Sequence, residues 1–331
     1  MKLSYLILDT TDPAYNLAAE QYVFDALPRE RAYFMLWQND NAVIVGKHQN
    51  TLAEINEPYV REHGVRVVRR LSGGGAVYHD LGNLNFTFVM DAGDTEKLDL
   101  RLFCLPVVRT LEALGVRAQV NGRNDITVDG KKFSGNSQYL KQGRVMHHGT
   151  LLFDSDLGVV SEVLRVDEEK FRSKAAKSVR SRVTNLRPYL PPDCTLAAFR
   201  QALLDNVLAE TPGEPYALTP DDRAAIEALR ASRYATYDWN YGASPECTMR
   251  KKRRFEGCGT VEAYFTIRRG VIEGLVFRGD FFSLDEPETL AARLTGLRPE
   301  AEQYARALSG FDVSRCFAGL SNEAFLRFLS E

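Results

Sequence analysis

The sequence predicts an α+β fold with a mixed or antiparallel sheet, arranged as a large N-terminal domain followed by a small α+β domain. Its 331 residues are enough for two domains with a sizeable core. The expected strands and helices do not alternate in regular βαβ units, which disfavours a doubly wound sheet. The composition changes between Tyr237 and Phe255, where Gly242, Pro245 and a basic run interrupt the periodic segments.

The first expected element is a helix with Asn16 as its N-cap. Its apolar positions share one face at helical spacing: Leu17, Val23, Phe24 and Leu27. Glu20 falls in the middle of that face. It is either a carboxylate at the edge of the stripe, as the rarity of buried glutamate suggests, or a functional acid beside a pocket.

The remaining elements follow from apolar periodicity. Strands are expected over residues 33–37, 42–46, 65–69, 84–90, 125–128, 132–138 and 146–153, and helices over 100–114 and 196–208. The second domain is expected to contain a hairpin of 259–268 and 271–278, turning at Arg269-Gly270, then helices over 287–294, 300–308 and 322–329. We therefore place the domains at residues 1–245 and 246–331.

The bulk composition excludes several classes of protein. The 42 basic and 44 acidic residues leave a formal net charge of -2, which gives no general attraction to nucleic acid or to a membrane surface. No stretch approaches 18 uninterrupted apolar residues, and the N-terminus lacks a secretory apolar segment. The five cysteines are scattered and form no CxxC pair, so we expect neither a disulfide framework nor a thiolate zinc site. We expect a cytoplasmic location, where cysteines stay reduced.

Three consecutive glycines, Gly73 to Gly75, follow an expected strand. Such a loop can bring successive backbone N–H groups close to an anion. Arg69 and Arg70 precede it and His79 follows it, and arginine suits phosphate or carboxylate. The loop matches neither GxGxxG nor GxxxxGK[ST]. On these residues alone, an anion site and a tight structural turn both remain open.

A hairpin is expected around Asp129-Gly130, a sequence typical of type I′ turns. In its second strand, Lys132, Ser134 and Asn136 would share one face while Phe133 takes the other. Without further context, Lys132 is more often a solvated surface lysine than a functional one.

The pair His147-His148 opens another expected strand. Adjacent residues of a strand point to opposite faces, so the two imidazoles cannot bind one metal side by side. We therefore expect no zinc site.

In this order, four blocks of sequence resemble the lipoate–protein ligase family. They are residues 69–80 with Gly82-Asn83 after them, residues 122–138, residues 147–152 and residues 173–186. The resemblance covers essentially residues 3–245 and continues more weakly beyond. It implies a biotin/lipoyl-ligase-like α+β catalytic domain with a mixed β-sheet and a small accessory domain. It also implies a two-step reaction, in which lipoate and ATP with Mg²⁺ form lipoyl-AMP and the acyl group then passes to a lysine. The acceptors would be lipoyl domains of 2-oxoacid dehydrogenases or the glycine-cleavage H protein.

The resemblance also implies roles for individual residues. Lys132 corresponds to the central catalytic lysine, in contact with both lipoate and nucleotide. The implied nucleotide contacts are Arg70, Gly75, Ala76, Val77, Tyr78, Asn83, Asn124 and Asp125, with Asp125 also a candidate for Mg²⁺. The implied lipoate pocket consists of Leu17, Glu20, Gly75, His79, Lys132, His148 and Gly149.

Two segments admit more than one interpretation. The loop from Lys174 to Arg182 is either an exposed basic loop or a lid that orders over the adenylate. The run from Arg250 to Arg254 is expected to be a solvated interdomain linker, with a docking stripe for acidic acceptor domains as the alternative.

Other functions remain as alternatives to the ligase. A lipoyl or octanoyl transferase of the same superfamily would use a cysteine nucleophile, but no cysteine lies near the matching blocks, and Cys104 is expected on a core helix. A biotin ligase is disfavoured because its GRGRxG-type loop is missing. A non-catalytic lipoate- or nucleotide-binding protein would keep the pocket alone.

Overall fold

The structure is a computed structural model that describes residues 2–92, 100–122, 124–164, 182–242, 249–268 and 270–330. Its largest feature is an eight-stranded sheet in the order β11-β1-β2-β6-β10-β9-β8-β7. β1 is parallel to β2 and β11, and the other neighbours are antiparallel, so the expected mixed sheet is confirmed. The strands are β1 (Lys2–Ile7), β2 (Arg31–Trp37), β6 (Asn83–Asp91), β7 (Ala118–Asn121), β8 (Asp125–Val128), β9 (Lys131–Lys141), β10 (Arg144–Leu152) and β11 (Gly213–Pro215).

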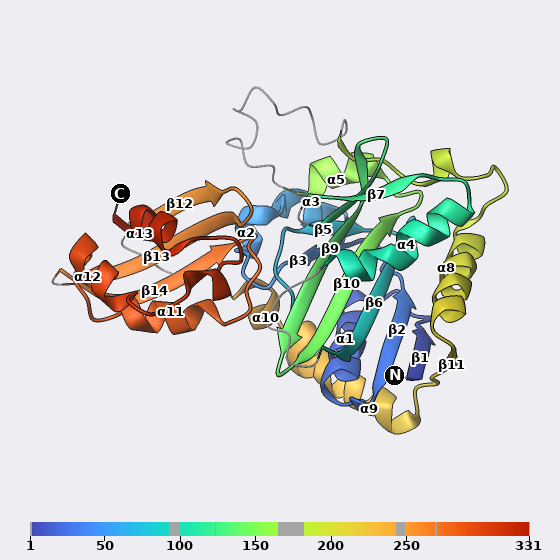
Figure 1. The fold of residues 1–331 in the computed structure, drawn as a ribbon, viewed down its shortest axis with the longest axis horizontal. Coiled ribbons are helices and arrows are strands. Elements are labelled where there is room, and N and C mark those ends of the chain that lie inside the picture. The colour runs from blue at the N-terminus through green and yellow to red at the C-terminus, as the bar shows by residue number, and fades with distance from the viewer. Residues whose placement is uncertain are drawn as a thin grey trace.

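Helices cover both faces of this sheet (Figure 1). The longer ones are α1 (Pro13–Asp25), α4 (Arg101–Ala113), α8 (Leu196–Glu210) and α9 (Pro220–Leu229). Alternation along β2 separates the two cores: Phe34 and Leu36 pack with α4 and α8, while Met35 and Trp37 pack with α1 and α9. This alternation directs Trp37 to the same layer as Leu17 of α1.

The start of α1 differs from the prediction. Asp12, not Asn16, is the N-cap, and its carboxylate accepts from the Ala14 amide at 3.1 Å. Asn16 is buried inside the helix and donates to Gln38 O and Asn39 Oδ1. Asp12 takes the capping position because it directly precedes Pro13, a residue favoured in the first helical turn.

A second, small sheet carries the glycine loop. β3 (Ala42–Val45) lies between β4 (Arg66–Arg69) and β5 (Val77–His79), parallel to the first and antiparallel to the second. The loop therefore joins the two strands that flank β3. The shorter helical segments nearby and beyond were not predicted: α2 (Thr51–Glu54), α3 (Glu57–Glu62), α5 (Leu157–Val163), η1 (Arg187–Tyr189), η2 (Arg230–Tyr234) and α10 (Tyr237–Tyr241).

The C-terminal part has its own sheet and core. β13 pairs with both β12 and β14, and helices pack on one face of the sheet. Its elements are β12 (Met249–Phe255), β13 (Gly259–Arg268), β14 (Val271–Gly279), α11 (Pro287–Leu294), α12 (Ala301–Ala307), η3 (Val313–Arg315) and α13 (Asn322–Ser330). The expected hairpin and the three expected helices are confirmed; Arg269 of the turn lies outside the described residues.

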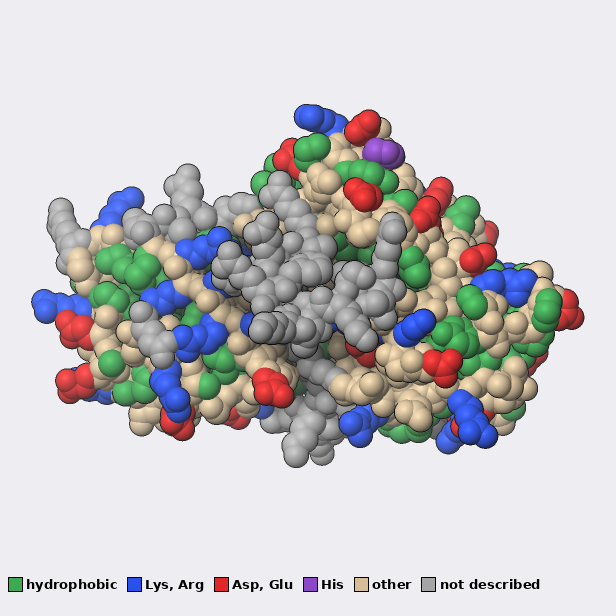
Figure 2. Space-filling view, turned by 90° about the horizontal axis from the view of Figure 1, so that it is seen from above, with side chains coloured by type: hydrophobic (Ala, Val, Ile, Leu, Met, Phe, Trp, Pro, Cys, Tyr) green, Lys and Arg blue, Asp and Glu red, His purple; other side chains and the backbone are tan. Residues whose placement is uncertain are grey.

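The basic run is a strand rather than the expected linker. Arg250 to Arg254 lie within β12, at an edge of the C-terminal sheet, and their exposure alternates with the pleat. Glu262 pairs with Arg250 at 2.7 Å and with Lys252 at 3.5 Å, so acidic neighbours partly neutralise the run. Charged edge strands resist pairing with other chains, a role that sequence alone does not distinguish from a linker. Figure 2 shows Lys and Arg side chains spread over this end of the molecule.

No helix in the described part of the chain is long and apolar enough to cross a membrane.

Candidate active site

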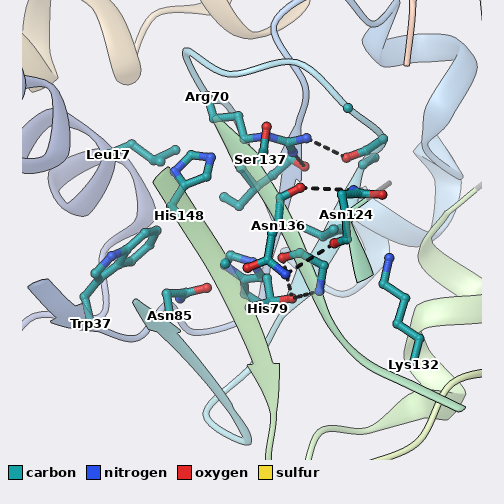
Figure 3. A pocket seen from close by; sticks show the side chains of 18 residues that line it. Leu17, Trp37, Arg70, His79, Asn85, Asn124, Lys132, Asn136, Ser137 and His148 are labelled. Carbon is teal, nitrogen blue, oxygen red and sulfur yellow. Dashed lines mark hydrogen bonds between the residues drawn. The ribbon is translucent and has the colours of Figure 1, made fainter. Parts of the chain in front are cut away.

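A cavity of about 130 Å³ opens between the glycine loop, α1 and strands β9 and β10 (Figure 3). In this view Leu17, Trp37 and His148 lie toward one end and Lys132 toward the other. Its lining residues are Leu17, Trp37, Ile44, Arg70, Gly74, Gly75, Ala76, Val77, His79, Asn85, Asn124, Lys132, Gly135, Asn136, Ser137, His148, Gly149 and Thr150. The arrangement suits an elongated ligand with an apolar body and a polar end.

Most of the residues expected from the sequence meet at this cavity. Those that line it are Leu17, Arg70, Gly75, Ala76, Val77, His79, Asn124, Lys132, His148 and Gly149. Glu20, Tyr78, Asn83 and Asp125 do not belong to its lining. Tyr78 points away because residues alternate along β5, and its hydroxyl donates to Asn41 Oδ1 at 3.2 Å. Asn83 lies behind Asn85 and donates to its Oδ1 at 3.0 Å.

Several lining residues were not predicted from the sequence, including Trp37, Asn85 and Ser137. Trp37 could have been found, because the alternation of β2 places it in the layer of Leu17. Ser137 carries no local signal, since its role depends on a hydrogen bond to Gly73 O across the fold, at 2.9 Å.

Different structural constraints explain why each of the three positions in the loop is a glycine. A Cβ on Gly73 would lie 2.3 Å from Phe281 O, in the C-terminal part of the chain. Gly74 has φ +91° and donates its amide to the same carbonyl at 3.3 Å, so this N–H is not available to a ligand. Gly75 has nothing within 4 Å of a Cβ position. Gly74 and Gly75 both line the cavity, and of the three glycines only Gly75 has open space at its Cβ position.

Arg69 and Arg70 differ in their use. Arg69 is buried and donates to carbonyl oxygens that include Gly46 O at 2.8 Å and Gln49 O at 2.7 Å. It therefore holds the chain together and does not form the expected anion fork. Arg70 lines the cavity and donates to Gly73 O at 2.7 Å and Gly75 O at 2.9 Å. Burial lowers the pKa of Arg70 to about 10, so the side chain remains a cation at neutral pH.

Lys132 reaches the polar end of the cavity from β9. The I′ turn before it is confirmed, with φ of 50° at Asp129 and 72° at Gly130. Nζ of Lys132 lies 2.7 Å from Asp125 Oδ1, and about a third of each side chain is exposed. A Cβ on Gly135 would approach this Nζ to 3.0 Å. A register shift in the β8–β9 pairing interrupts strict alternation after Lys132, yet Lys132 and Asn136 still line the same cavity.

His79 is a neutral side chain in the cavity wall. Asn39 Oδ1 accepts from Asn16, so Asn39 Nδ2 is the donor toward His79 Nδ1, at 3.1 Å. The proton of His79 is then on Nε2, a buried atom that has no hydrogen-bond partner. Burial, with a smaller effect of Arg70, lowers the pKa of His79 to about 3.

The two adjacent histidines lie on opposite faces of β10, as expected. His148 lines the cavity, and its Nδ1 lies 3.0 Å from the buried carboxylate of Glu20. His147 packs against Phe103 on the other side, at 5.0 Å between ring centroids, and burial holds its pKa well below the usual value. Among the residues described, no cluster of three or more His, Cys, Asp or Glu side chains could hold a metal ion.

The cavity offers no cysteine nucleophile of the kind a transferase would need, among the residues that the structure describes. None of the described residues that line it is a cysteine. Cys104 is buried in the core under α4, as expected, and Cys194 is buried in the same core. Cys247 and most of the proposed lid, from Lys174 to residue 181, lie outside the described residues.

Comparison with known proteins gives two family matches. The family described as the lipoyl protein ligase A/B catalytic domain matches residues 12–208, and the bacterial lipoate protein ligase C-terminus matches residues 244–329. The chain is 40% identical to lipoate–protein ligase 1 of Staphylococcus aureus over 320 residues, covering 97% of each chain. It is 41% identical to the lipoate–protein ligase LplJ of Bacillus subtilis over 319 residues, covering 95% of this chain and 96% of that protein.

Solved structures agree with these matches. The fold resembles that of P. falciparum LipL1 in complex with lipoate, with a TM-score of 0.80 and 22% identity over 99% of this chain and 98% of that chain. A bipartite lipoate protein ligase of Thermoplasma acidophilum, studied with its E2 lipoyl domain, has a TM-score of 0.66 and 29% identity over 75% of this chain and 100% of that chain. A lipoate–protein ligase A bound with ATP has a TM-score of 0.63 and 26% identity over 74% and 100%.

Proposed function

Because the chain belongs to the lipoyl protein ligase A/B family and is a lipoate–protein ligase, we propose how its own residues carry out that reaction. The position of Lys132 in the cavity is the main observation that supports this proposal. Lys132 Nζ lies at one end of a cavity beside the glycine loop, and the apolar side chains of Leu17 and Trp37 lie at the other end. Lipoate would place its ring and alkyl chain against Leu17 and Trp37 and its carboxylate toward Lys132.

The first step joins two anions. An oxygen of the lipoate carboxylate attacks the α-phosphorus of ATP, and pyrophosphate leaves. The ammonium group of Lys132 between carboxylate and phosphate reduces their repulsion and stabilises the charge that develops on phosphorus. Gly75, whose Cβ position is open, allows the nucleotide to approach the backbone. We assign Arg70, Ala76, Val77 and Asn124 to the nucleotide side of this site, with Arg70 acting mainly by holding the loop carbonyls.

The second step transfers the acyl group. The deprotonated amine of an acceptor lysine attacks the acyl carbon of lipoyl-AMP, an amide bond forms, and AMP leaves. Lys132 can stabilise the oxyanion of this step because its Nζ already lies where the carboxylate is placed. Holding the adenylate beside the acceptor lysine also favours the reaction through proximity.

Asp125 is the residue that fits Mg²⁺ best. Magnesium is commonly held by one or two carboxylates together with substrate phosphates, so a single carboxylate is sufficient. Asp125 supplies a partly exposed carboxylate next to Lys132 Nζ. When bound, the ion would neutralise phosphate charge.

We further propose the acceptors, the location and the division of the chain. Lipoyl domains and the glycine-cleavage H protein are the proposed acceptors, which the T. acidophilum ligase studied with its lipoyl domain supports. A cytoplasmic location would supply ATP. Residues 1–245 would form the catalytic domain and 246–331 the accessory domain, supported by the separate core that begins at β12.

An ATP–pyrophosphate exchange assay tests the proposed function. Exchange should depend on added lipoate and should survive a thiol alkylator, because no described cavity residue is a cysteine. Exchange that is absent, combined with acyl transfer that an alkylator blocks, would support the transferase instead.

A further inference from the structure

Glu20 is buried at the centre of a hydrogen-bonded chain that no single sequence motif contains. Glu20 is 1% exposed and is not part of the cavity lining. On one side it accepts from the Thr87 hydroxyl, which itself accepts from Trp37 Nε1 at 2.9 Å. On the other side it lies 3.0 Å from His148 Nδ1. We call the whole chain the Glu20 network: Trp37, Thr87, Glu20, His148, Ser72 and Arg70.

The other half of the network ends at the glycine loop. Ser72 Oγ lies 2.6 Å from His148 Nε2 and accepts from Arg70 Nε at 3.1 Å. Ser72 is 1% exposed, so its hydroxyl proton needs an acceptor inside the protein. Ser72 Oγ contacts Arg70 and His148, and because Arg70 can only donate, His148 Nε2 is the acceptor.

This assignment fixes the direction of every bond. His148 accepts at Nε2, so its proton is on Nδ1 and is donated to Glu20. On one side, Trp37 donates to Thr87 and Thr87 donates to Glu20. On the other side, Arg70 donates to Ser72, Ser72 to His148, and His148 to Glu20. A carboxylate can accept from both sides, whereas an amide of the same size presents a donor on one side.

The network reaches the nucleotide half of the site through Arg70. The same guanidinium that donates to Ser72 also donates to Gly73 O and Gly75 O. Arg70 is buried, which lowers its pKa, and the charge of the buried Glu20 carboxylate raises the pKa of Arg70 against this effect of burial. No direct contact joins the two charges in the described part of the chain, so a change at Glu20 should reach Arg70 and the loop through the bonds of His148 and Ser72.

We propose that Glu20 is a positioning residue for the nucleotide half of the site, acting through His148 and Ser72 on Arg70 and the glycine loop. This role rests on the ligase function proposed above. It differs from contact with lipoate, the role that the family resemblance implies for Glu20. Through the same bonds, the His148 wall of the acyl cavity is joined to the loop that receives ATP.

The test measures KM and kcat in lipoate-dependent ATP–pyrophosphate exchange for Glu20→Gln, Ser72→Ala and the double variant. Both single changes should raise KM for ATP or lower kcat by about tenfold and change KM for lipoate less than about twofold. The double variant should be no worse than the more impaired single variant, because both changes break one chain. Asp25 is an exposed carboxylate on the same helix, so Asp25→Asn is the matched control. Its KM values and kcat should equal those of the wild type.

Two results from this assay would overturn the proposal. One is a rise in KM for lipoate alone in Glu20→Gln, which would make Glu20 an acyl-contact residue. The other is additive loss in the double variant. If Glu20→Gln fails to fold, Ser72→Ala and Thr87→Val still test the two arms of the chain.

A spectroscopic measurement tests the direction of the bonds without catalysis. In ¹⁵N-histidine spectra of the wild type, His148 should be protonated at Nδ1 and not at Nε2, with its signal assigned through His148→Gln. Protonation at Nε2 would overturn the proposal. Because this result does not require turnover, it is separate from the proposed function, which fails instead if the wild type shows no lipoate-dependent exchange.

Discussion

Replacing Gly73 with alanine would push a methyl group against the carbonyl of Phe281. The Cβ would lie 2.3 Å from that oxygen and 3.2 Å from Phe282 Cα, whereas an ordinary contact begins at 3.4 Å. The neighbours are backbone atoms and cannot turn aside, so the loop must separate from the C-terminal segment. The hydrogen bond from the Gly74 amide to Phe281 O would be lost with it. From the usual cost of overpacking, we expect a loss of about 1–3 kcal/mol of stability.

Gly75→Ala is the matched control for this change. Nothing lies within 4 Å of its Cβ position, and its φ is not positive, so stability should stay within about 0.5 kcal/mol of the wild type. Its methyl group would instead obstruct the nucleotide and lower lipoate-dependent exchange. Thermal unfolding followed by fluorescence, together with the exchange assay, separates the two effects. An unchanged unfolding temperature for Gly73→Ala, or an equal loss for Gly75→Ala, would refute this division of the triplet.

Three further outcomes follow from buried groups. The pKa of His79 is about 3 in the folded protein against a usual 6.5, so the unfolded chain binds the proton first as the pH falls. The free energy of unfolding should therefore decrease as the pH falls from 6.5 to 3, and this group should contribute a loss of about 2 kcal/mol from pH 7 to pH 5. Denaturation measured against pH should show a shallower slope in His79→Asn. Arg69→Lys should lose roughly 2–4 kcal/mol in urea unfolding, because lysine cannot reach the same carbonyl oxygens, while KM for ATP of the folded protein changes little; a large KM effect with normal stability would contradict a structural role. Gly149→Ala places a Cβ 2.2 Å from Asn136 Oδ1 and 2.5 Å from the Phe86 ring, so both stability and exchange should fall, and wild-type exchange would contradict the packing.

Local rules predicted much of the frame that holds Lys132. The Asp129-Gly130 turn and the separation of His147 from His148 depend on neighbours in sequence, and so does the β13–β14 hairpin of the C-terminal sheet, away from this frame. Turn geometry and strand alternation are properties of a few consecutive residues, so a sequence contains them directly.

Contacts between distant segments explain what the sequence could not predict. Arg69 and Arg70 look equivalent in sequence, but Arg69 donates to the Trp239 carbonyl within α10, while Arg70 donates to the loop itself. Glu20 similarly meets His148 across 128 positions. Such pairings exist only after the chain has folded, and no local pattern encodes them.

In the proposed mechanism, Lys132 stabilises the charge formed when lipoate and ATP react. The most direct measurement is lipoate-dependent ATP–pyrophosphate exchange by Lys132→Leu, compared with Lys131→Leu, an exposed neighbour outside the cavity. We expect Lys132→Leu to remain folded and to lose at least about 99% of exchange, and Lys131→Leu to keep nearly all of it. Exchange above about a tenth of the wild-type rate in Lys132→Leu would contradict the claim.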